Sequence, residues 1–388
     1  MPGNAWVRSI PNTCGEMERE AKSRRFNVIE AFGVMTFCLV VLWVVQYPFG
    51  VLMEIEFANT LSSGLLFVGA MYLLFGSPFL HGDTLSSWGL GNPVALWRMV
   101  RHEQEPTSGT RGSYPLSSRL QGYVVAGIVL ALIGGLSFAF CSYWVEASKF
   151  LFSMKREAAE AFISTVGGRV CVVILGVILS TFFAMCVIRY DNFLSALFTA
   201  FKVLLVLGTA LYLTAYAVMG ASAFADFDGS KFALDVFGYI FWGALQQLLF
   251  SSYFGTRLRK GFAPAKSPEN VWKVRLAVAV LNGAFFGIIH INSWFLAGVC
   301  WLLGCFLSWV FMEDRNRNLI ALGFIQGFLG SSVGWLFARD KAGGFRMNMG
   351  VGPTHMKGFD LPTVVVVAAL IVGFTGFMIR AYRDWRED

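Results

Sequence analysis

Amide side chains occupy the polar positions in the second half of an otherwise apolar chain. Gln246 and Gln247 are adjacent within ALQQLLFSSYF, His290 ends AVLNGAFFGIIH, and Gln326 lies in NLIALGFIQGFLGSSVGW. Only the imidazole among them titrates near neutral pH, because a carboxamide has no ionisable group there. A carboxylate can take a proton from water and return it to a leaving amine, which an amide cannot do. These positions therefore predict a hydrogen-bonding site without a general base.

The order and spacing of these segments resemble the CPBP family, the CAAX proteases and bacteriocin-processing (Abi-type) enzymes. These are glutamic intramembrane proteases with the motifs E-E-x-x-x-R, F-x-x-x-H and H-x-x-x-N on successive membrane helices. Only the second motif is intact here, as Phe286 and His290. The other positions carry uncharged replacements: Gln246 and Gln247 for the glutamates, Ser251 for the arginine, Gln326 for the histidine and Gly330 for the asparagine. The resemblance covers residues 241–337 and implies a protease fold without its catalytic groups.

Each of these residues also has a purely structural interpretation. Paired amides bond between membrane helices, at about 0.6–2 kcal/mol for each bond. A single histidine at a membrane boundary is commonly hydrogen-bonded or faces the headgroups. If the residues do share a cavity, we expect Gln246, Asn282, His290 and Gln326 to line it, and the cavity to be polar but uncharged. No residue is assigned a catalytic role.

The composition predicts an all-α, polytopic membrane protein. Of the 388 residues 56% are hydrophobic and 14% are charged, which is too apolar for a soluble domain of this size. A hydrocarbon core about 30 Å thick requires about 20 helical residues. We expect ten such spans, at 31–52, 61–80, 122–144, 168–188, 197–219, 233–253, 275–291, 294–312, 318–338 and 361–380.

The basic residues lie beside these spans, so the net charge of +7 does not indicate a nucleic-acid partner. With ten spans, the N-terminal segment, the loops after spans two and six, and the C-terminus all lie on one side. The positive-inside rule places both termini in the cytoplasm, and we expect a prokaryotic cytoplasmic membrane. The loop at 339–360 does not fit this rule, because ten spans place it on the external side of the membrane although it carries four basic residues: Arg339, Lys341, Arg346 and Lys357.

Three segments are expected along the chain. Residues 1–120 form a polar cytoplasmic segment, two transmembrane helices and a polar loop; 121–340 form the CPBP-like core; 341–388 form a Gly/Met-rich loop and the last span. The stretch at 149–164 has helical spacing with charges between its apolar residues, and predicts a helix along the membrane surface. On span nine, Gly323, Gly327, Gly330 and Gly334 form a smooth strip that either packs inside the bundle or contacts a partner.

Other chemistries have no matching pattern. A zinc ion requires three or four His, Cys or carboxylate ligands, and only His290 is available in the core, so we expect no metal and no cofactor. The leading hypothesis is a degenerate CPBP-like protein that binds another membrane protein, a peptide or a lipid, as a scaffold or accessory subunit. The alternative is an active intramembrane endopeptidase with an atypical site around His290. A small-solute transporter is the third hypothesis.

Overall fold

The chain is an all-α polytopic helical bundle. The computed structural model describes residues 14–91, 116–152, 154–187, 189, 192–225, 227–262, 271–337, 352, 353, 356 and 358–387. Within these ranges all regular structure is helical, and nine helices are long and apolar enough to cross a membrane, or ten if one bent pair counts as a span. The protein is therefore an integral, multi-pass membrane protein. Most of the polar loop expected before residue 120 lies outside the described residues, as does most of the loop at 339–360.

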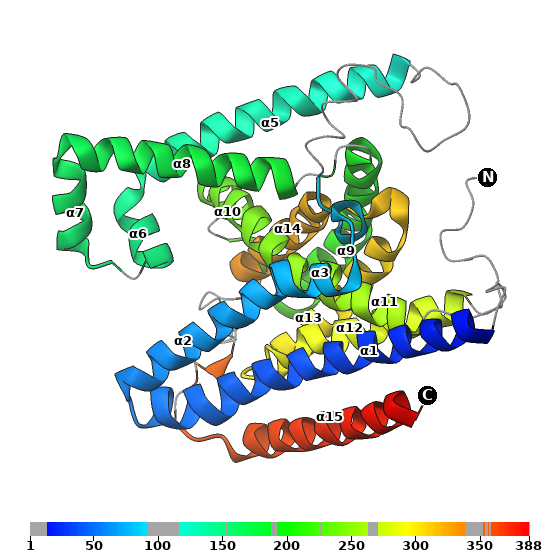
Figure 1. Cartoon of the computed structure of the whole chain (residues 1–388). Coiled ribbons are helices and arrows are strands. Elements are labelled where there is room, and N and C mark those ends of the chain that lie inside the picture. Colours follow the sequence, from blue (N-terminus) through cyan, green and yellow to red (C-terminus); the bar gives the residue numbers. More distant parts are fainter. Residues whose placement is uncertain are drawn as a thin grey trace. The chain divides into compact units, whose positions relative to one another are not determined.

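The chain divides into two compact units, Met1–Trp88 with Leu197–Asp388, and Gly89–Ala196. The N-terminal helices thus share a unit with residues 197–340 of the expected core, whereas residues 121–196 of that core belong to the other unit. The helices of the first unit are α1 (Cys14–Leu39), η1 (Val40–Leu52), α2 (Glu56–Met71), η2 (Tyr72–Gly76), α3 (Ser77–His81), η3 (Leu85–Trp88), most of α9 (Phe193–Met219), η4 (Gly220–Phe224), α10 (Gly229–Gln247), η5 (Leu248–Phe254), α11 (Gly255–Phe262), α12 (Val271–Ile288), α13 (Trp294–Met312), η7 (Asp314–Asn316), α14 (Leu319–Phe337) and α15 (Leu361–Glu387) (Figure 1). Those of the second unit are α5 (Leu116–Ser142), α6 (Trp144–Phe152), α7 (Arg156–Ser164) and α8 (Val166–Val187).

Two expected span boundaries are corrected by the structure. The first membrane helix begins at Lys22 rather than at 31, and so includes Glu30. The sixth runs from Gly229 to Phe262 through the π-helical turns of η5, so that Arg257 and Lys260 lie on a helix and not in a loop. The expected spans stop before these charged residues because an isolated charge is costly inside a membrane. In the folded chain these charges are paired.

The start of α1 and the end of α15 lie at the same end of the first unit, where the two helices run side by side (Figure 1). Arg25 donates a hydrogen bond to the backbone carbonyl of Asp384. The Lys22 ammonium lies 5.1 Å from the centre of the Trp385 ring. We call this end the terminal face.

The fourth expected span, at 168–188, corresponds to α8. This helix passes the length and hydropathy test for a span only together with α7, from which it is bent by 105°. Among the described residues the number of spans is therefore nine, or ten if this pair counts as one.

Candidate functional site

Four side chains form a continuous hydrogen-bonded chain between α10, η5 and α14. The Ser251 hydroxyl donates to Oε1 of Gln247, and Nε2 of Gln247 donates to Oε1 of Gln326 at 2.8 Å. Nε2 of Gln326 in turn donates to Oε1 of Gln246. Gln247, Ser251 and Gln326 are all buried. The adjacent pair on α10 therefore meets one partner on α14, and we call this arrangement the amide chain.

The amide chain has a direction, because every link donates toward Gln246. Each donated bond polarises the next group, so such chains are cooperative. The carboxamide NH2 of Gln246 is the last donor, and it has no hydrogen-bond partner among the described residues. The amide chain therefore ends in a free donor.

Gln246 lines a cavity of about 270 Å³ between α9, α10, α12, α13 and α14. Five of the seven positions of the three CPBP-like motifs line it: Gln246, Phe286, His290, Gln326 and Gly330. Most other lining residues are Leu, Val, Phe or Trp, and none is an Asp, Glu, Lys or Arg. The remaining two positions, Gln247 and Ser251, lie behind Gln326 as links of the amide chain.

His290 contributes the opposite kind of group to the cavity. It lies in the turn between α12 and α13, is 4% exposed, and its Nδ1 lies 2.9 Å from the carbonyl oxygen of Phe286. A carbonyl accepts only, so Nδ1 carries the proton, and Nε2 of the neutral ring is an acceptor. Burial lowers the pKa of His290, although the bond to Phe286 works in the other direction. The neutral form, with its acceptor, is therefore favoured at neutral pH.

Asn282 requires a correction to the expected cavity, because it is not among the lining residues. Its Nδ2 donates to the carbonyl of Phe250 at 3.0 Å and to the hydroxyl of Ser308 at 2.6 Å. The side chain is 1% exposed. Asn282 thus connects α12 to η5 and α13, and has a packing position rather than a lining position.

Tyr239 fills the space at Gly330, where the resemblance expects an asparagine. A Cβ atom added at Gly330 would lie 3.2 Å from Cδ1 of the Tyr239 ring. The ring also lines the cavity, and its hydroxyl has no hydrogen-bond partner among the described residues. Sequence analysis did not single out this residue; the missing side chain at Gly330 was the available signal.

The glycine strip packs inside the bundle. A Cβ atom at Gly323 would lie 2.4 Å from the carbonyl oxygen of Ile240, and one at Gly327 would lie 2.6 Å from the Ile240 nitrogen. These two glycines therefore bring the α14 and α10 backbones together, which in turn places Gln326 against the pair on α10. Only Gly334 has open space around it. The alternative of an external contact through Gly323 and Gly327 is thus excluded.

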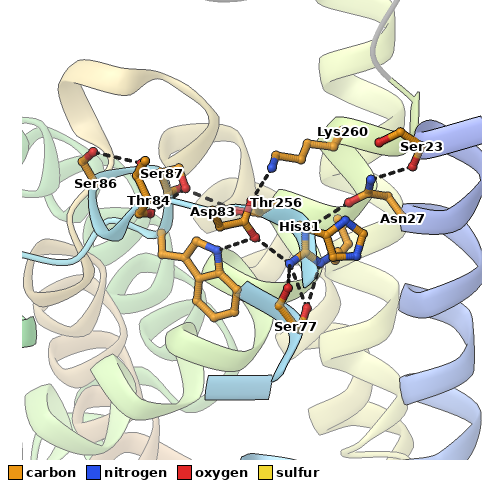
Figure 2. Close-up of polar contacts among 12 residues, drawn as sticks. Ser23, Asn27, Ser77, His81, Asp83, Thr84, Ser86, Ser87, Thr256 and Lys260 are labelled. Atoms are coloured by element: carbon orange, nitrogen blue, oxygen red, sulfur yellow. Dashed lines mark hydrogen bonds and ion pairs between the residues drawn. The ribbon is translucent and has the colours of Figure 1, made fainter. Parts of the chain in front are cut away.

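A second polar region, at the terminal face, was missed by sequence analysis. Arg257 is fully buried, and its guanidinium pairs with Asp83 and lies 3.6 Å from Oε1 of Glu30. Lys260 forms an ion pair with the same Asp83 carboxylate (Figure 2). We call these four residues, with His81, the ionic cluster. It connects α1, the end of α3 and α11.

Neutral groups complete the ionic cluster. Nη1 of Arg257 donates to Asn27 at 3.0 Å, and Nη2 donates to the Ser77 hydroxyl at 2.8 Å (Figure 2). The Tyr253 hydroxyl donates to Glu30 at 3.1 Å, and that carboxylate also bonds with His81. Every charge therefore has an opposite charge and further hydrogen bonds, the condition under which buried ion pairs are tolerated.

Asp83 lies outside the membrane helices, and its ionisation follows the same pattern. Burial works to raise the pKa of its carboxyl group, but the hydrogen bond from Lys260 and the charge of Arg257 outweigh that effect. The pKa is consequently below its usual value. Nε1 of Trp88 also donates to this carboxylate, at 3.0 Å. Asp83 is therefore ionised and fully engaged at neutral pH.

A metal site is not supported by the geometry of the described residues, where no three His, Cys, Asp or Glu side chains form a group that could hold an ion. No family model, curated protein or solved structure matches this chain.

Proposed function

We propose that this chain is a catalytically degenerate CPBP-like membrane protein that acts by binding, as a scaffold or accessory subunit. The amide chain is the observation that carries this proposal. It occupies the positions where the resemblance requires a general base, and it is engaged in hydrogen bonds that a base would have to break. Binding of another membrane protein, a peptide or a lipid requires no proton transfer and is compatible with these groups.

The alternative, an endopeptidase centred on His290, has one favourable feature. His290 lines the cavity, and the Nε2 of its neutral ring is an acceptor that could take a proton from water. However, the lowered pKa makes the ring a weaker base, and no carboxylate lines the cavity to stabilise the imidazolium form. The geometry therefore favours binding over hydrolysis.

The orientation in the membrane follows from the basic residues at the terminal face. This end carries Lys22, Arg24 and Arg25 of α1 together with Arg383 and Arg386 of α15. By the positive-inside rule, we infer that the terminal face and both termini are cytoplasmic. A prokaryotic cytoplasmic membrane stays an expectation. Reporter fusions after residues 24 and 386 should both report the cytoplasm. A reporter signal outside the membrane from either fusion would overturn this orientation.

Mild-detergent purification tests the binding role. The wild-type chain should elute with a stoichiometric second component, a membrane protein, peptide or lipid, which mass measurement and identification of the co-eluting molecules would detect. Gln326→Leu should reduce the amount retained, because it removes the centre of the amide chain beside the cavity. Lys202→Met is the control: its ammonium lies over Phe198 on the exposed side of α9. Elution of the wild-type chain with nothing bound would contradict the proposal.

A further inference from the structure

Three residues that line the cavity each have a polar group without a hydrogen-bond partner in the described part of the chain. These groups are the Gln246 NH2, the Nε2 of His290 and the Tyr239 hydroxyl. The first only donates, the second only accepts in the neutral ring, and the third does both. None of the three is among the fully buried polar atoms that lack a partner, so a ligand in the cavity can reach them and form hydrogen bonds with them.

The lining of the cavity restricts the charge of such a ligand. No Asp, Glu, Lys or Arg contributes to it. A phosphate, carboxylate or ammonium group would enter without an opposite charge, which costs several kcal/mol in apolar surroundings. The ligand head must therefore be neutral.

The donor and the acceptor together specify the head group. Gln246 requires an acceptor atom on the ligand, and His290 requires a donor. A hydroxyl group meets both requirements with a single oxygen, because it accepts through its lone pairs and donates through its proton. An ester or a ketone would satisfy Gln246 but leave His290 without a donor.

The walls specify the rest of the molecule. They are formed by aliphatic side chains: Leu207, Leu211, Leu296, Leu303, Leu329 and Val333. The volume of about 270 Å³ lies just under the usual range of ligand pockets, roughly 300–1,000 Å³. A volume of this size suits a ligand with a single hydrocarbon chain. All the helices around it are membrane spans, so lipid is the source from which the ligand enters.

We propose that this cavity binds a single-chain lipid with a hydroxyl head, which accepts from Gln246 and donates to His290. The inference rests on the proposed binding function and names its ligand class. Tyr239 lies beside the head, on the surface that Gly330 leaves open. The hydrogen bond from Gln326 engages the carboxamide oxygen of Gln246 and leaves its NH2 for the ligand.

The test is equilibrium binding of radiolabelled 1-dodecanol to the purified full-length protein in detergent. Unlabelled 1-dodecanol should compete fully, whereas dodecane and dodecyl phosphate should compete at least about tenfold less well, as expected when one hydrogen bond is lost or a charge is buried. Gln246→Leu should weaken binding about tenfold. Gln46→Leu, the same change at a residue that does not line the cavity, should leave binding unchanged.

A second variant covers the case in which Gln246→Leu fails to fold. Tyr239→Phe keeps the ring over Gly330 and removes only the hydroxyl; it should weaken 1-dodecanol binding several-fold without changing the unfolding temperature. Equal competition by dodecane and 1-dodecanol, no saturable binding, or binding unchanged in every folded variant would overturn the ligand class. The proposed function fails by a different result, peptide cleavage that His290→Ala abolishes, so the two failures can be told apart.

Discussion

The amide chain and the ionic cluster are two buried polar regions on the same continuous helix, and they differ in how completely their groups are paired. Gln246 and Gln247 lie at the end of α10, and Arg257 follows on α11 about 15 Å farther along the axis. The ionic cluster contains four ionised side chains, each with an opposite charge. The amide chain contains no charge, and it ends in a donor without a partner beside a cavity.

This difference separates stability from binding. A fully paired set of charges leaves no group free to bind a ligand. Removing any one of the charged side chains leaves its partner as an uncompensated buried charge, which is destabilising. A neutral chain with a free end is less costly to maintain and retains binding capacity. We therefore assign the ionic cluster to holding α1, α3 and α11 together, and the amide chain to the cavity.

Removing the central cation of the ionic cluster should have the largest effect. Arg257→Met leaves Glu30 and the Ser77 hydroxyl without their guanidinium partner and should lower the free energy of unfolding by about 3–5 kcal/mol. Thermal unfolding in detergent would measure this. Arg156→Met is the matched control, because the Arg156–Glu160 pair is exposed, and it should not shift the transition. Equal transitions in the two variants would show that the ionic cluster is not structural.

Gly327→Leu should be the next most damaging change. The new side chain would meet the backbone of Ile240 and push α14 from α10, at a cost of about 1–3 kcal/mol or more. A Cβ atom at Gly334 on the same helix meets no atom within 4 Å, so Gly334→Leu should be tolerated. Unfolding temperatures of the pair test this. Similar stability of both variants would show that the strip does not pack against α10.

Acid should act on the ionic cluster and leave the amide chain unaffected. The folded pKa of Asp83 lies below its unfolded value of about 3.9, so its contribution is complete above that pH and is lost as the pH falls through the folded pKa. Asp83→Asn should be less stable at neutral pH and should show a shallower loss of stability in acid. Unfolding temperatures measured from neutral pH to about pH 3 would follow this. If the unfolding temperature of Asp83→Asn fell with pH as steeply as that of the wild type, Asp83 would not be the source of the acid sensitivity.

Shortening the amide chain at its first link should have the smallest effect. Ser251→Ala leaves one acceptor site of Gln247 unfilled and should cost about 1 kcal/mol, the net contribution of one hydrogen bond. It should also lower 1-dodecanol affinity slightly, because the remaining amides lose one cooperative neighbour. Unfolding and binding measured on one preparation would show both. A loss as large as that of Arg257→Met would mean that the amide chain also holds the fold.

Hydropathy accounts for most of the helices, which follow from apolar length. Of the four residues expected to share a cavity, Gln246, His290 and Gln326 line one, and Asn282 does not. The ionic cluster could not be derived this way. An isolated Arg257 marks the end of a membrane span on any hydropathy scale, and only its pairing with the distant Glu30 allows the helix to continue. The acidic residue inside the first apolar helix was the available signal.

Hydrolysis of hydrophobic peptides by the purified protein tests the central claim most directly. Wild-type protein and His290→Ala would be incubated with prenylated and unprenylated membrane peptides, and products would be detected by mass spectrometry. The amide chain has no group that can take a proton from water, so the account predicts no cleavage by either protein. It also predicts that the unfolding temperatures of the two proteins differ only by the effect of the lost hydrogen bond between His290 and Phe286. Reproducible cleavage by the wild type that His290→Ala abolishes would contradict the account and identify the chain as a working protease.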